Sequence, residues 1–109
     1  MIARTWHAHA SPDRADSYAA HFTETVAPSL KRLAGHRGAF LLRREAEGQV
    51  EFLALTLWES RASIEAFAGK DISRAHVEPE GQAALSSFDD FADHYDVAFT
   101  SAGAAGTYP

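Results

Sequence analysis

Two neighbouring segments with strand patterns are apolar on both faces, and this feature constrains the fold more than any other. They span residues 38–46 and 50–58 and are joined by Glu47-Gly48-Gln49, a short glycine-containing link that is typical of a β-hairpin. In the second segment two apolar sets alternate: Val50, Phe52, Ala54 and Trp58 against Leu53, Leu55 and Leu57. An antiparallel sheet with a free face would alternate apolar and polar residues. We therefore expect both faces of this hairpin to be covered.

The stretch before the hairpin predicts a strand and then a helix. Residues 2–9 suit a pleated, half-buried strand. Ser11 is a candidate N-cap, with Pro12 at the first helical position. We expect Pro28 to kink or divide this helix and Gly35 to end it. An apolar stripe at helical spacing runs along it: Tyr18, Phe22, Val26, Leu30 and Leu33.

The stretch after the hairpin predicts a second helix and a last strand. Ser60 is the expected N-cap, and Gly69 the expected end. Asp71 is a candidate cap for a further turn that carries Ile72 and His76. Residues 78–88 form a weak short helix or a loop, residues 91–99 a final strand, and residues 100–109 a flexible C-terminal tail.

The element order is β-α-β-β-α-(α)-β, which predicts a single α+β domain over residues 1–99 with a ferredoxin-like fold. In that fold the helices cover one face of an antiparallel sheet. The apolar second face must then meet something else, and the simplest partner is the same face of another copy. We therefore expect a homodimer that joins through the sheet face into a dimeric α+β barrel.

Composition narrows the partners and the compartment. The chain has no cysteine, which excludes disulfides and thiolate metal sites and fits a reducing cytoplasm. It has no signal-peptide pattern and no run long enough to span a membrane. The net charge is −5 and the basic residues are scattered, which argues against nucleic acid or an anionic membrane as partner. We expect a cytoplasmic location.

Four features occur together in this chain: the element order, the Trp58-Glu59-Ser60 junction after the third strand, the Ser60 to Phe67 helix and the Arg74-Ala75-His76 triplet. In this combination the chain resembles the antibiotic-biosynthesis monooxygenase family. The resemblance covers roughly residues 2–99. It implies a dimeric ferredoxin-like barrel with one of two chemistries. One branch oxidises aromatic polyketides or quinols with O₂ and needs no metal or cofactor. The other binds haem and cleaves its ring.

The resemblance assigns three positions to a haem site. These are a histidine on the helix after the junction that ligates iron, the junction tryptophan against the porphyrin, and an asparagine on the first strand. His76 and Trp58 match the first two, whereas Thr5 is nearest to the third and the chain contains no asparagine. This departure weighs against haem degradation but not against haem binding.

Two residues keep alternative interpretations. Trp58 is either the wall of a pocket for a planar ring or a large core residue. His76 is an iron ligand, a general base near neutral pH, or a histidine favoured by the C-terminal end of a helix dipole.

Two further features lie on the first strand. His7 and His9 share one strand face, a spacing that can chelate a metal if His94 or Asp96 supplies a third ligand. Such pairs are more often satisfied or exposed, and we expect no metal site. Arg4 should pair with a carboxylate or lie in the dimer interface.

A cofactor-free oxygenase needs a substrate that supplies the electrons, so the site must remove a proton, stabilise the oxyanion and hold a flat ring in a dry pocket. The predicted site has Trp58, Phe22 and Phe67 as walls, His76 or His7 as base, and Thr5 as hydrogen-bond donor. A haem-binding protein that uses His76 is one alternative. A non-catalytic barrel for a small ligand is another, and a pocket too small for a bicyclic ring would favour it.

Overall fold

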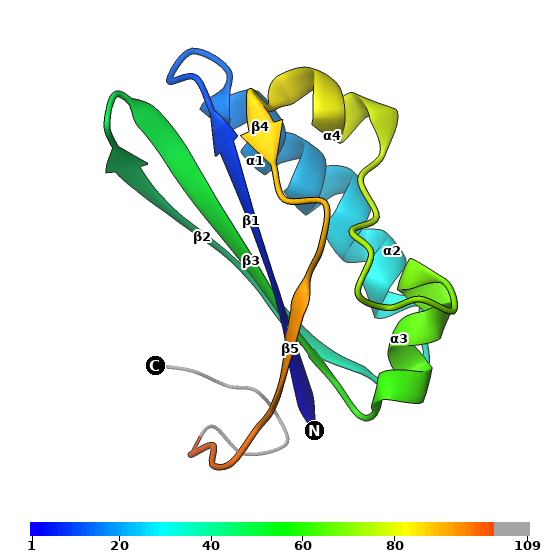
Figure 1. The fold of residues 1–109 in the computed structure, drawn as a ribbon. Coiled ribbons are helices and arrows are strands. Elements are labelled where there is room, and N and C mark those ends of the chain that lie inside the picture. Colours follow the sequence, from blue (N-terminus) through cyan, green and yellow to red (C-terminus); the bar gives the residue numbers. More distant parts are fainter. Residues whose placement is uncertain (102–109) are drawn as a thin grey trace.

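A five-stranded antiparallel sheet forms the frame of this computed structural model, which describes residues 1–101. The strands are β1 (Ile2–Ala10), β2 (His36–Ala46), β3 (Gln49–Trp58), β4 (Ser87–Phe88) and β5 (Asp93–Asp96). They run in the order β2-β3-β1-β4, with β5 also paired to β1. The helices all lie on one side of the sheet (Figure 1). The predicted α+β ferredoxin-like fold is confirmed.

The hairpin between β2 and β3 is also confirmed, with slightly longer strands than the sequence predicted. Its turn uses positive φ angles at Glu47 (53°) and Gly48 (77°), as a tight hairpin turn requires. β2 begins at His36, and a register shift between His36 and Gly38 marks an irregularity at this end. Leu53 of β3 pairs with Leu42 of β2 in this hairpin.

The first helical region is divided as predicted, although its start differs and it ends at Lys31, with Arg32 and not Gly35 as the C-cap. α1 (Ala15–His21) is followed by the π-helical turn η1 (Phe22–Val26) and by α2 (Ala27–Lys31). Pro28 lies in the first turn of α2, where its missing N–H is not needed. The expected N-cap at Ser11 is wrong, because Arg14 occupies that position and makes no side-chain cap. The carbonyl of Ser11 instead accepts hydrogen bonds from the N–H groups of Arg14 and Ala15.

The second helix, α3 (Arg61–Ala68), begins and ends where the sequence predicted. Ser60 caps it, accepting a hydrogen bond from the N–H of Ser63, and the Ser63 hydroxyl completes the capping box. Gly69 follows with a positive φ of 85°. Asp71 accepts hydrogen bonds from Ser73 in a turn that does not continue as a helix.

The last part of the chain corrects the prediction of one strand over residues 91–99. The stretch predicted as a weak helix or loop contains α4 (Pro79–Ala84), and two short strands follow it, β4 and β5. Both pair with β1, but the link between them turns away to another segment. The N–H of Ala75 donates to the carbonyl of Asp90, and the N–H of Ala92 donates to that of Ser73. These bonds replace the pairing with β1 that a continuous strand would make.

The core lies between the sheet and the helices. Trp58, Phe52, Leu30 and Ile64 are the largest fully buried side chains. The opposite face carries large apolar residues that remain exposed, among them Phe40 and Leu42. Of the predicted tail, residues 102–109 lie outside the described part of the chain. No helix over residues 1–101 is long and apolar enough to cross a membrane.

Candidate functional site

A small cavity between the sheet and the helices is the best-defined candidate site, and its volume is about 60 Å³. That volume holds a few water molecules but not an aromatic ring. Its walls come from β1, β3, the first helical region, α3, α4 and the irregular segment before α4. The lining residues include Arg4, Trp6, Tyr18, His21, Phe22, Thr56, Phe67, His76 and Glu78.

Three of the residues predicted for the site meet in this cavity: Phe22, Phe67 and His76. The ring of His76 packs edge-on against Phe67, with ring centroids 5.3 Å apart. His76 is also solvent-exposed, so it lies at the rim of the cavity. It belongs to the irregular segment after α3 and not to a helix.

Trp58 is a core residue and does not line the cavity. Its side chain is 0% exposed. The indole packs against His36, with centroids 5.1 Å apart, and against Phe67, with centroids 6.1 Å apart. Its N–H donates to the hydroxyl of Thr56 at 2.8 Å. The expectation that Trp58 forms the cavity wall is therefore wrong in this structure, because the side chain lies behind that wall.

Thr5 and His7 lie on the opposite face of the sheet, so the prediction that they share a pocket with His76 is also wrong. Successive side chains of a strand point to opposite faces. Arg4 and Trp6 line the cavity, whereas Thr5 pairs with Leu55 and His7 pairs with Leu53 on the outer face.

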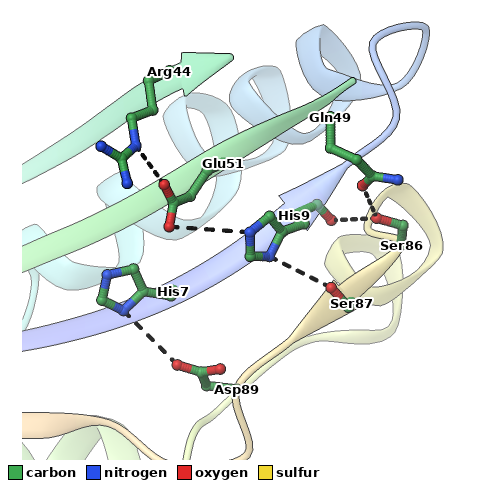
Figure 2. A network of polar contacts seen from close by, with 8 residues as sticks. All are labelled: His7, His9, Arg44, Gln49, Glu51, Ser86, Ser87 and Asp89. Atoms are coloured by element: carbon green, nitrogen blue, oxygen red, sulfur yellow. Dashed lines mark hydrogen bonds and ion pairs between the residues drawn. The ribbon is translucent and has the colours of Figure 1, made fainter. Parts of the chain in front are cut away.

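His7 and His9 belong to a polar network at one end of the outer face (Figure 2). His7 lies 3.8 Å from Asp89, and His9 lies 4.0 Å from Glu51. Glu51 also accepts a hydrogen bond from Arg44 at 2.5 Å, and this bond holds the pKa of the Glu51 carboxyl below its usual value. Three further residues complete the network: the hydroxyl of Ser86 donates to the side-chain oxygen of Gln49, and the hydroxyl of Ser87 lies 3.5 Å from Nδ1 of His9.

The candidate third metal ligands do not join this network. His94 contacts Arg4 on the inner face, and Asp96 pairs with Arg61 at 3.5 Å. Among residues 1–101 no group of three potential ligands is close enough to hold a metal ion. An open groove of about 300 Å³ lies beside His7, between Leu42, Leu53 and Glu51.

Arg4 is the residue whose placement the sequence predicted least well. It is buried, with 5% exposure, and lines the inner cavity rather than the outer face. Its guanidinium donates to the backbone carbonyls of Ile72 and Arg74 and contacts the ring of His94. No carboxylate pairs with it within the described part of the chain. The sequence did indicate this placement, because the alternation of side chains along β1 puts Arg4 on the same strand face as the apolar residues Ile2 and Ala8.

Two aromatic residues form the cavity wall that sequence reasoning missed. The indole N–H of Trp6 donates to the carbonyl of Asp89 at 2.7 Å, and its ring lies 6.5 Å from Tyr18. Tyr18 packs against Phe52 at 5.1 Å. Burial raises the pKa of Tyr18 to about 12, so its phenol stays protonated at neutral pH. His21 completes this side and lies 3.7 Å from Glu80.

The residues do not fit a haem site. Trp58 is enclosed in the core, His76 stands at the rim, and Thr5 faces the other side of the sheet. The three positions therefore share no common surface, and a cavity of about 60 Å³ cannot enclose a porphyrin.

Comparison with known structures identifies the same architecture. A Deinococcus radiodurans protein that carries the name antibiotic biosynthesis monooxygenase aligns at 12% identity with a TM-score of 0.63, covering 92% of this chain and 95% of that one. A Bacillus cereus protein of the same name aligns at 16% identity with a TM-score of 0.62, covering 94% and 97%. SnoaB, a cofactor-independent oxygenase from Streptomyces nogalater, aligns at 13% identity with a TM-score of 0.55, covering 92% and 96%. At these identities the likeness shows a shared fold.

Sequence comparison gives the family directly. No curated protein matches the chain significantly. The family model described as antibiotic biosynthesis monooxygenase matches residues 1–79, which include β1, the first helical region, the hairpin, α3 and the segment with His76. The chain therefore belongs to the antibiotic biosynthesis monooxygenase family.

Proposed function

We propose that the protein is a cofactor-independent monooxygenase that oxidises an aromatic or quinol-type substrate with O₂ in the inner cavity. The observation that carries this proposal is the cavity with aromatic walls and a histidine at its rim, where His76 packs on Phe67. Family membership supports the reaction class. The fold shared with a cofactor-independent oxygenase is consistent with it.

The reaction starts with loss of a proton from the substrate. His76 is the candidate base, because a neutral imidazole accepts a proton near neutral pH. The substrate anion is a stronger reductant than the neutral phenol and passes its electrons to O₂. One oxygen atom enters a ring C–H bond as a hydroxyl, and the other leaves as water with two hydrogens from the substrate. The quinol is oxidised to a quinone in the same reaction, so the substrate supplies all four electrons that O₂ accepts and no external reductant is needed. Trp6, Tyr18 and Phe22 supply flat apolar walls that keep bulk water away from the ring.

The cavity has to widen before it admits a ring. The part of the wall that is best suited to move is the segment from Ala75 to Glu78, which belongs to neither a helix nor a strand. Displacing such a segment breaks fewer backbone hydrogen bonds than displacing a strand. We infer that substrate enters beside His76.

Oxygen uptake with a panel of quinols tests the proposal. We expect at least one quinol to be consumed, and His76→Ala to lower its turnover about 100-fold, in the range for loss of a general base. His7→Ala is the matched control, because His7 lies on the outer face. If His7→Ala abolishes turnover and His76→Ala does not, the reaction occurs on the outer face and the proposal is wrong.

The small volume of the cavity favours a second candidate function, a non-catalytic barrel that binds a small ligand. The two functions differ in one measurement. Under the second, a small ligand binds and quenches the fluorescence of Trp6, while no quinol in the panel causes oxygen uptake above that of buffer.

We also propose that the protein forms a homodimer through the outer face of the sheet. Leu42 is 48% exposed and Phe40 is 38% exposed there, beside the β3 residues Leu53, Leu55 and Leu57. The helices lie on the other side and leave this face uncovered (Figure 1). A contiguous apolar surface of this kind is typical of a protein interface.

A cytoplasmic location stays a prediction.

A further inference from the structure

The inner cavity contains a buried cation without a counter-charge. Arg4 is 5% exposed and lines the cavity, yet no carboxylate pairs with it over residues 1–101. Burial lowers the pKa of Arg4 from its usual value, but a guanidinium keeps its charge at neutral pH. A buried charge is costly unless an opposite charge or enough hydrogen bonds compensate it. The arrangement therefore favours an anion in the cavity.

The contacts of the guanidinium orient it without neutralising it. One terminal nitrogen donates to the carbonyl of Ile72 and lies 2.9 Å from Nε2 of His94, and the other donates to the carbonyl of Arg74 at 3.0 Å. Burial, and then the neighbouring Arg4, lower the pKa of His94, so His94 is a neutral acceptor. These contacts occupy only part of the donor set, because a guanidinium carries more N–H groups than they use.

The other charged groups around the cavity are few. Glu78 is the only acidic side chain among the residues that line it, and no ion pair joins it to Arg4 in the described chain. His21 lies beside Glu80, which is exposed, and His76 is at the rim. The carbon at the centre of the Arg4 guanidinium is 5.9 Å from the centroid of Phe67. A ring held between the aromatic walls can therefore present an anionic oxygen to Arg4.

We propose that Arg4 is the anion-binding residue of this cavity and that the ligand is an aromatic compound with an ionised hydroxyl or carboxyl group. This inference rests on the proposed function for its site, and it narrows the substrate to aromatic anions. In the oxidation proposed above, the substrate loses a proton before it reacts, so Arg4 would hold the anion that reduces O₂. The recognition chemistry is the same for a phenolate and for a carboxylate, and the test separates the two.

The first arm compares two ligands of nearly equal shape, salicylate and its neutral amide, salicylamide, by calorimetry without any oxidation. We expect the wild-type protein to bind salicylate about tenfold more tightly or better, which corresponds to a charge-assisted hydrogen bond. The second arm uses 4-nitrophenol, whose absorbance reports its ionisation. If the cavity prefers a phenolate, the bound compound ionises at a lower pH than the free compound.

Variants separate an anion-binding role from a structural one. Arg4→Gln removes the charge, and we expect it to lower salicylate affinity about tenfold while salicylamide affinity stays the same. A purely structural role, in which Arg4 only ties Ile72 and Arg74 to β1, would lower both affinities equally. Glu78→Gln is the opposite control, because removing a nearby negative charge should raise salicylate affinity. Circular dichroism verifies that each variant is folded.

The wild-type comparison needs no variant, so it decides the matter even if Arg4→Gln does not fold. Equal affinity for salicylate and salicylamide, together with an unshifted 4-nitrophenol ionisation, overturns the proposal. Failure of both ligands to bind at millimolar concentration overturns it as well. These results are independent of oxygen uptake. If the protein binds the anions but consumes no O₂, the role of Arg4 is supported and the proposed oxygenase function is wrong. If it consumes O₂ but shows no preference for anions, the oxygenase function is supported and the role of Arg4 is wrong.

Discussion

The indole N–H of Trp58 donates to the hydroxyl of Thr56 at 2.8 Å, two residues along the same strand face. Thr56 lines the cavity, whereas Trp58 lies behind it with 0% exposure. Core packing and lining of the cavity therefore belong to two different residues of this strand. Trp58 fills the core, and Thr56 satisfies its single polar atom at the edge of the cavity.

Replacing Thr56 with valine should destabilise the fold, because valine has nearly the same shape but cannot accept the hydrogen bond from Trp58. A buried donor left without a partner costs about 1–3 kcal/mol. Chemical denaturation measures the change in the free energy of unfolding. Thr56→Ser is the control, since it keeps the hydroxyl, and it should cost less than Thr56→Val. A larger loss in Thr56→Ser than in Thr56→Val would mean that the methyl group matters and the hydrogen bond does not.

Ligand binding in the inner cavity should be detected by one of the two tryptophans in the chain. Trp6 lines the cavity and Trp58 does not. We expect 4-nitrophenol to quench wild-type fluorescence and Trp58→Phe fluorescence, and to lose most of its effect in Trp6→Phe. A titration followed by tryptophan emission gives the answer. Quenching that depends on Trp58 alone would place the ligand elsewhere.

The stability of the protein should fall as the pH drops through the range in which free histidine is protonated. Burial lowers the pKa of His36, and its Nδ1 is buried without a hydrogen-bond partner among the described residues. Burial also lowers the pKa of His94. The unfolded chain thus binds protons more readily than the folded one below a pH of about 6.5, and the free energy of unfolding decreases there as pH falls.

Urea denaturation between pH about 7.5 and about 5 measures this effect, and His36→Phe should flatten the slope. The carboxyls whose pKa is lowered, Asp13, Glu51 and Asp71, act at a lower pH, because their stabilisation is lost only as pH falls through their folded pKa. A slope unchanged in His36→Phe and in His94→Gln would contradict the assignment.

Gly35 and Gly48 offer a matched test of steric crowding. Both have positive φ angles, 86° and 77°, which strain any L-residue by about 1–2 kcal/mol. A Cβ at Gly35 would lie 2.5 Å from the Cβ of Ser63, whereas a Cβ at Gly48 would meet nothing within 4 Å. Gly35→Ala should therefore lower the melting temperature clearly more than Gly48→Ala. Equal losses would indicate that Ser63 of α3 can move away from residue 35 without cost.

A charge on the outer face should dissociate the proposed homodimer. Leu55 lies on that face, between Thr5 of β1 and Phe40 of β2. Leu55→Arg would bury a guanidinium in an apolar interface, which is unfavourable without a partner. Analytical ultracentrifugation should give a dimer for the wild-type chain and a monomer for the variant. Glu65→Arg, on an exposed position of α3, is the control and should stay dimeric. A monomeric wild-type protein would refute the interface.

Local patterns predicted most of the elements because their causes are local. The hairpin follows from the glycine-containing link, the division of the first helix from Pro28, and the start of α3 from Ser60. The failures have non-local causes. The last strand is broken into β4 and β5 because residues near Asp90 pair with residues near Ser73, far away in the chain.

The candidate site shows the same division. Phe22, Phe67 and His76 were identified from the helical stripe and from the resemblance, and they do meet in the cavity. Arg4 and Trp6 were missed, although alternation along β1 already separated them from Thr5 and His7. The local pattern does not show which face of β1 the helices cover.

Local patterns were enough to predict the order of the elements up to α3, the Ser60 cap and the hairpin, because these depend on neighbours a few residues apart. The sequence also determined that both faces of β3 are apolar. Three placements depend on the folded chain instead: Trp58 belongs to the core, His7 lies outside the cavity, and Arg4 lies inside it without a carboxylate among the described residues. The physical reason is that burial and charge pairing depend on segments brought together by folding, such as β1 and the segment near Ile72, which a local pattern cannot register.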